Sequence, residues 1–231
     1  MDIEKNKEGQ NMIVEALKDK ACTKQKIYKI THDSFDSFKR ILQEYMNNLQ
    51  DVFSNLDPDV HFEYRDNGEF ESSIKFSGDT LVFNMHSNIF NFDDSHAVHQ
   101  MPYVQEDPLN VYCGMIEIYN FLSDSFRYQR LNDTGYLIAR VFINREKHFF
   151  IEGERQLGFL YNDFENMEIN DVYIKAIIEA SILYAIEFDL WVPSYQDVRE
   201  ITVSQKLMSS GVQALKTAKR MGFKFQAEHE S

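Results

Sequence analysis

The sequence predicts one α+β domain with a mainly antiparallel sheet, and three observations support this fold class. Apolar residues recur with the helical period over residues 35–53 and 171–190. Over residues 60–85 they alternate with the period of two that is typical of strands. Short turns separate the runs, as in hairpins of antiparallel strands. We therefore expect a sheet of about six to eight strands covered by the two long helices.

The composition favours a single core. The 231 residues include 19 Phe and 12 Tyr, and 43% of the chain is hydrophobic, which supplies enough large side chains to bury a core of this size. The four Pro and nine Gly are scattered, and no Gly- or Ser-rich stretch resembles a linker. We expect one domain over residues 1–231, with disordered tails at residues 1–10 and 226–231.

The helical segments differ in their patterns. Residues 11–21 have helical composition, and residues 26–30 suggest a short strand or an extended connector. Thr31 or Asp33 is then expected to cap the amphipathic helix over residues 35–53. The helix over residues 171–190 is apolar nearly all round, which predicts that it is buried against the sheet. A last helix is expected over residues 195–221.

The strand pattern begins with a three-stranded meander. Residues 60–64, 70–76 and 81–85 alternate, and the first turn, Asp66-Asn67-Gly68, suits a tight hairpin. Residues 111–121 fit either a strand or a helix. Further strands are expected from hairpin spacing, over residues 126–131, 136–143, 148–151 and 155–161. Residues 93–110 form the one long irregular segment, and a loop of this length is either functional or poorly ordered.

The charge and the termini limit the environment and the partners. A net charge of −13 argues against a broad nucleic-acid-binding face, and residues 57–107 hold eleven Asp or Glu against Arg65 and Lys75. No apolar run approaches the roughly 20 residues needed to cross a bilayer. The charged opening lacks a secretory signal, and Cys22 and Cys113 suit reduced, buried thiols. We expect a soluble cytoplasmic protein whose partner is another protein or a second copy.

Familiar catalytic and cofactor motifs do not occur in the chain. It has no P-loop, no G-x-G-x-x-G, no C-x-x-C, no H-E-x-x-H and no G-x-S-x-G. Their absence removes the easily recognised nucleotide-binding proteins, zinc fingers and α/β-hydrolases. The leading hypothesis is therefore a non-catalytic interaction or regulatory domain, in which aromatic side chains left exposed on one face would mark the partner surface.

A metal-dependent hydrolase is the first alternative. Imidazole and carboxylate groups gather near the irregular segment, and such groups are ligands of Zn²⁺ and Mn²⁺. The spacing of the last two His residues suits a shared metal only if that segment forms a helical turn. The candidate ligands are His86, Asp93, Asp94, His96 and His99.

Acid–base residues form a second candidate group. Glu152 and Glu154 are two residues apart, so an extended strand places both on one face, where like charges raise the pKa of one carboxyl. His148 lies close by in the sequence. The structural alternative is a solvated hairpin end in which Arg145 or Arg155 pairs with the carboxylates.

The last alternative is nucleotide or nucleic-acid binding by the basic C-terminal segment. Cations alternate there with Phe223 and Phe225, a combination that binds phosphate and stacks on bases. The same residues also suit an ordinary helix end capped by Gly222. The candidate residues are Lys216, Lys219, Arg220 and Lys224.

Overall fold

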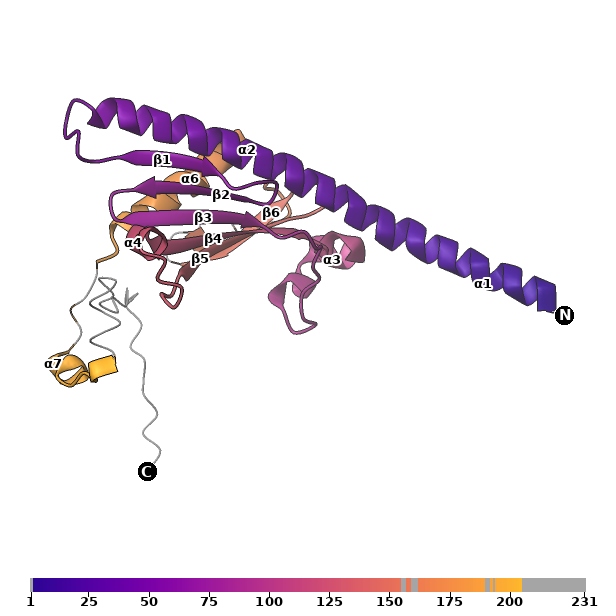
Figure 1. The fold of residues 1–231 in the computed structure, drawn as a ribbon. Coiled ribbons are helices and arrows are strands. Elements are labelled where there is room, and N and C mark those ends of the chain that lie inside the picture. The colour runs from indigo at the N-terminus through magenta and orange to yellow at the C-terminus, as the bar shows by residue number, and fades with distance from the viewer. Residues whose placement is uncertain (1, 155–156, 159–161, 190–191, 193, 205–231) are drawn as a thin grey trace.

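Six strands form one antiparallel sheet in the order β1-β2-β3-β4-β5-β6 (Figure 1). The structure is a computed structural model that describes residues 2–154, 157–158, 162–189, 192 and 194–204, with side chains from residue 9. The strands are β1 Phe62–Asp66, β2 Glu71–Phe76, β3 Asp79–Met85, β4 Gly114–Leu122, β5 Tyr136–Ile143 and β6 Phe149–Gly153. The predicted α+β class is confirmed, including the meander of β1, β2 and β3.

The chain begins with a long helix that extends well beyond the sheet (Figure 1). It consists of α1 (Asp2–Ala16), a π-helical turn η1 (Leu17–Ala21) and α2 (Cys22–Phe53), with no break between them. Residues 1–10, expected to be a disordered tail, are therefore helical from residue 2.

The predicted strand or connector at residues 26–30 is wrong. Ile27, Thr31 and Phe35 are fully buried at the spacing of one helix face, so the buried stripe continues through this segment. Burying Ile27 outweighs the strand preference of the surrounding β-branched and aromatic residues. Thr31 does not cap a helix, because its hydroxyl donates to the carbonyl oxygen of Ile27, 2.8 Å away.

Helix α6 (Asp171–Ile186) packs with α2 on one face of the sheet, called the inner face here. Its N-cap is Asn170, whose side-chain oxygen accepts hydrogen bonds from the backbone N–H groups of Val172 and Tyr173. The two helices and the inner-face residues of the strands form the main core, as predicted. Its largest fully buried side chains include Phe35, Phe38, Phe83 and Phe149.

The opposite, outer face of the sheet is covered over part of its area by residues 86–113. This segment contains three short helices, η2 (Ala97–Gln100), α3 (Pro102–Glu106) and η3 (Pro108–Val111). Buried Val98 and Val104 pack with Phe142 and Phe150 from β5 and β6 in a second apolar cluster. The irregular segment predicted at residues 93–110 is thus a folded layer over the sheet.

The structure settles one open segment and corrects one predicted strand. Residues 111–121, left open between strand and helix, contribute to β4, whereas the strand predicted at residues 126–131 is replaced by helix α4 (Ser123–Arg127). β5 therefore pairs with β4. Ser123 is buried, and its hydroxyl lies 2.9 Å from that of Thr80, which fixes the start of α4 against β3.

The structure describes only part of two other predicted elements. In the segment 155–161, only Leu157 and Gly158 are described, and both are helical. Of the last expected helix, only α7 (Tyr195–Val198) forms before the chain leaves helical geometry at residues 199–202, and residues 205–231 lie outside the described part. Within that part, no helix combines the length and the apolar character needed to cross a membrane.

The two cysteines have different environments. Cys113 is fully buried, and burial raises the pKa of its thiol. Cys22 is exposed, so the expectation that both thiols are buried is wrong for Cys22. Cys22 is the first residue of α2, and the buried face of the long helix begins only at Ile27.

Candidate functional site

Two candidate residues from different parts of the sequence meet on the outer face. His96 Nε2 lies 3.1 Å from Glu152 Oε1, and the other oxygen of Glu152 accepts a hydrogen bond from Arg140. Arg140 and Glu152 are also cross-strand partners in β5 and β6. The ring of Phe92 stacks on His96 with a centroid distance of 4.7 Å. The carboxylate of Glu152 thus joins two strands to the covering segment 86–113.

Both ring nitrogens of His96 are engaged within the chain. Nδ1 accepts a hydrogen bond from the backbone N–H of Val98 at 3.2 Å, as the N-cap of η2. The proton of the neutral ring therefore lies on Nε2 and is donated to Glu152. A metal ion or a substrate proton at His96 would have to displace one of these bonds.

The other metal candidates have separate partners. His86 Nδ1 accepts from the N–H of Asn88 at 3.1 Å, Asp93 binds the N–H and hydroxyl of Ser95, and His99 Nε2 lies 3.3 Å from the carbonyl oxygen of Phe92. Asp94 is exposed. Within the described residues, no three His, Cys, Asp or Glu side chains are placed to share a metal ion. The Zn²⁺ or Mn²⁺ site stays a prediction, which elemental analysis of the purified protein checks.

The acid–base candidates do not gather around one point. Glu152 belongs to β6, whereas Glu154 follows the last residue of that strand, so the extended segment expected to carry both carboxylates ends between them. His148 precedes β6 and packs against Tyr103 with a ring-centroid distance of 5.2 Å. A catalytic role for these residues stays a prediction. The basic candidates Lys216, Lys219, Arg220 and Lys224 lie outside the described residues.

Lys175 and Glu179 form an ion pair on the surface of α6. The ammonium nitrogen of Lys175 lies 3.9 Å from a carboxylate oxygen of Glu179, one turn along α6. The carboxylate also raises the pKa of the Tyr45 hydroxyl, after the larger effect of burial.

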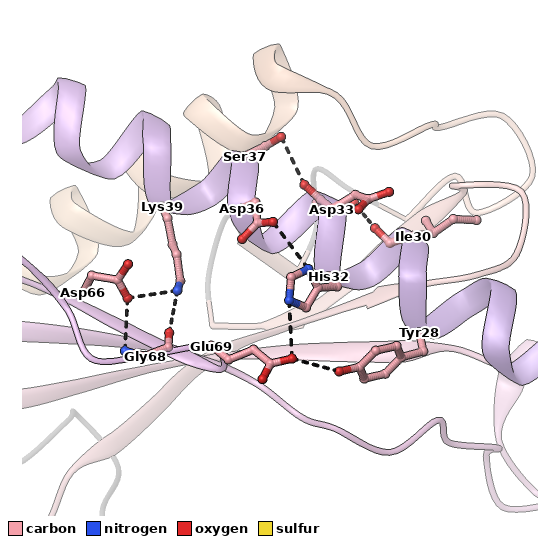
Figure 2. A network of polar contacts seen from close by, with 11 residues as sticks. Tyr28, Ile30, His32, Asp33, Asp36, Ser37, Lys39, Asp66, Gly68 and Glu69 are labelled. Carbon is pink, nitrogen blue, oxygen red and sulfur yellow. Dashed lines mark hydrogen bonds and ion pairs between the residues drawn. The ribbon is translucent and has the colours of Figure 1, made fainter.

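A polar network joins α2 to the turn between β1 and β2, as Figure 2 shows. Glu69 accepts a hydrogen bond from the Tyr28 hydroxyl at 3.2 Å and lies 3.6 Å from His32 Nε2. Two helical turns after His32, Lys39 Nζ lies 2.9 Å from Asp66. The network holds the long helix against the edge of the sheet, so we assign it a structural role.

We expect the Lys39 contact to make stability depend on acid pH. Its hydrogen bond to Asp66, helped by the N–H of Gly68, lowers the pKa of the Asp66 carboxyl below the ordinary value. This contribution is therefore complete above about pH 4 and is lost as pH falls through the folded pKa. Asp66 is largely exposed, so Asp66→Asn should cost less than about 1 kcal/mol at pH 7 and still less in acid.

Urea unfolding at pH 7 and in acid measures this effect. Asp51→Asn is the control, since Asp51 is exposed on the same helix and has no ion-pair partner among the described residues. An Asp66→Asn defect of equal size at both pH values would contradict the assignment.

The projecting helix carries four exposed apolar side chains that lie close together in the sequence. The exposed fractions are 71% for Met12, 60% for Ile13, 60% for Val14 and 57% for Leu17. We call these four residues the α1 patch. The ammonium groups of Lys20 and Lys24 lie over the ring of Tyr112, at 5.5 and 5.3 Å, where the helix passes the covering segment. The helical spacing of Ile13 and Leu17 is visible in the sequence, but their exposure is not.

A second uncovered region is a hollow on the outer face beside α4. It has a volume of about 550 Å³ and is lined by residues of β1, β2, β3 and α4. We call it the outer-face hollow. Its charged and apolar residues are Glu63, Arg65, Glu71, Lys75, Val82, Phe126 and Arg127.

Comparison with protein-family models, with curated proteins and with solved structures gave no match. The function is therefore argued from these surfaces alone.

Proposed function

We propose that this protein is an interaction protein that assembles with a second copy of itself through the projecting helix α1. The observation that supports the proposal is the α1 patch. Its four apolar side chains are more than half exposed on a helix that leaves the body of the molecule (Figure 1). Contiguous exposed apolar side chains of this kind are typical of protein-binding surfaces.

Helix physics supports a pairing role. α1 continues α2 through η1, but residues 9–20 are all exposed and gain no packing energy, and Gly9 lowers the stability of α1 by about 1 kcal/mol. Packing against another helix would bury the α1 patch and stabilise the helical state. The π-helical turn at Leu17–Ala21 separates this segment from the part that packs on the sheet.

The charges favour a second copy as the occupant. The whole chain has a net charge of −13, so two copies of the protein repel each other at most orientations. Residues 9–20, in contrast, carry two carboxylates, Glu15 and Asp19, and two ammonium groups, Lys18 and Lys20. An antiparallel pairing centred between Ala16 and Leu17 places Glu15 of one copy level with Lys18 of the other. Two copies can therefore meet at this neutral segment while their acidic bodies remain apart.

The prediction is a reversible dimer that depends on the α1 patch. The pairing surface is small, so we expect a dissociation constant of about 1–100 µM. The double variant Ile13→Glu with Leu17→Glu should be monomeric throughout, because four carboxylates would then face one another in the pair. Sedimentation equilibrium over about 1–200 µM measures the mass of both proteins.

A matched control uses exposed apolar residues at the other end of the long helix. Val52 and Leu56 are 55% and 70% exposed, so Val52→Glu with Leu56→Glu makes the same chemical change away from α1. This control should still form the dimer. A wild-type protein that stays monomeric over the whole range, or a control that dissociates as readily as the α1 variant, would refute the proposal.

A further inference from the structure

We propose that the outer-face hollow binds a small organic anion with an apolar body, such as an aryl or short alkyl carboxylate or phosphate. This inference concerns the face of the sheet opposite α2 and α6 and is independent of assembly through α1. It rests on the positions of two cations, Lys75 and Arg127, that form no salt bridge within the described residues, and on the apolar residues beside them.

Strand register places the lining residues in two rows. Glu63, Lys75 and Thr80 are successive cross-strand partners in β1, β2 and β3. Arg65, Ser73 and Val82 form the neighbouring row two residues along each strand. Cross-strand partners on one face have Cβ atoms about 5 Å apart, so both rows lie within the span of a small ligand.

Helix α4 closes one side of the hollow. The hydrogen bond between Ser123 and Thr80, 2.9 Å long, holds the start of the helix at the end of the first row. Arg127 lies one helical turn after Ser123 and also lines the hollow, as does Phe126. The hydroxyl pair thus fixes a cation and an aromatic ring beside the sheet.

The cations of the hollow differ in their availability. Arg65 is held by Glu63 through hydrogen bonds of 2.7 and 3.1 Å, which together with nearby Lys75 lower the pKa of the Glu63 carboxyl. Lys75 faces Glu63 across the two strands, but within the described part of the chain it makes no hydrogen bond or direct salt bridge. Arg127 packs on the ring of Tyr128 and has no carboxylate partner among the described residues. Lys75 and Arg127 therefore remain free to bind an anion.

The apolar residues set the second requirement for a ligand. The ring of Phe126 is 52% exposed, whereas Val82 is buried at 9% and forms part of the floor. A ligand that places its anionic group between Lys75 and Arg127 would bury an apolar body against these two side chains. Apolar contact and a few polar groups that fix orientation are typical of small-molecule sites.

The surrounding charge limits the size of the anion. Eleven Asp or Glu occur over residues 57–107, so the field around the hollow repels polyanions such as nucleic acid. A compact anion between Lys75 and Arg127 is attracted by both cations. Because it carries only one anionic group, it places no further negative charge near the surrounding carboxylates. The hollow therefore suits one anionic group attached to an apolar body.

Titration with phenyl phosphate and with benzoate, followed by ¹H–¹⁵N NMR of the full chain, tests the inference. We expect saturable shifts confined to β1, β2, β3 and α4 with at least one of the two, and the tighter binder identifies the preferred anionic group. Inorganic phosphate has the anionic group without an apolar body, and benzyl alcohol has the apolar body without a charge. Each should therefore bind about tenfold more weakly than the tighter of the two ligands. Lys75→Gln and Arg127→Gln should each weaken binding about fivefold.

Lys175→Gln is the matched control, since Lys175 is an exposed cation of α6 on the other side of the sheet. It should leave the affinity unchanged, and the NMR spectrum shows directly that each variant is folded. Shifts scattered over the helices, or an affinity that Lys75→Gln and Arg127→Gln leave unchanged, would overturn the inference.

Discussion

Gly114→Ala should destabilise the protein by about 3 kcal/mol, because the contact between α2 and β4 leaves no room for a side chain. A Cβ atom at Gly114 would lie 2.1 Å from Oγ1 and 2.8 Å from Cβ of Thr31. Thr31 cannot easily move, since it is fully buried and its hydroxyl is bonded to the carbonyl oxygen of Ile27. Urea unfolding followed by circular dichroism measures the change in the free energy of unfolding.

Two further variants show whether this close approach is the cause. Thr31→Ala removes two of the three atoms that the new Cβ would meet, so it should recover part of the loss when combined with Gly114→Ala. Gly78→Ala is the control, because a Cβ there has no atom within 4 Å. If the double variant shows the full sum of the two single losses, the steric explanation is wrong.

Phe83→Ala should cost about 4 kcal/mol, the usual effect of removing a buried aromatic ring from a packed core. Phe83 lies on the inner face of β3 and is fully buried, as is Phe38 of α2. Their ring centroids are 6.1 Å apart at a tilt of 43°. A double-mutant cycle with Phe38→Ala should give a coupling of about 1 kcal/mol between helix and sheet.

The matched control is Phe126→Ala, which removes an aromatic ring that is 52% exposed. It should change the free energy of unfolding by less than about 1 kcal/mol. If Phe126→Ala destabilised the protein as much as Phe83→Ala, burial of the ring would not explain the effect of Phe83→Ala.

The fold could be predicted from the sequence where local pattern and burial agree. The stripe through Phe35 and Phe38 identifies a helix, and the Asp66-Asn67-Gly68 turn identifies the first hairpin, in which Gly68 adopts a φ of 111°. The prediction failed where local preference opposes packing. Around Ile27 the strand-favouring residues are helical because the buried stripe passes through them.

The predicted hairpin after residue 126 failed for another reason. Ser123 is held by a side-chain hydrogen bond to Thr80, which lies 43 residues earlier. A contact between residues so far apart leaves no periodic trace in the local sequence. The chain turns into α4 there because of this bond, and β5 then pairs with β4.

The candidate surfaces were predictable only in part. His96 and Glu152 were each identified by residue type, but their contact spans 56 residues and was not predictable from local spacing. Ile13 and Leu17 have the spacing of a buried helix face, and only the three-dimensional arrangement shows that nothing in the described chain covers them. Residue type thus identifies candidates, whereas exposure and distant contacts determine which surface each one belongs to.

The order of the strands has a consequence for how the protein is made. Each strand pairs with the one that directly precedes it in the chain, so the sheet can grow one strand at a time during synthesis. Contacts between neighbours in sequence require little loop-closure entropy, which favours rapid assembly. Helix α6 (Asp171–Ile186) is the exception, because it reaches back to α2 and β3. Until the ribosome has released residues 171–186, the growing sheet exposes apolar surface, and the docking of α6 is the step that removes it.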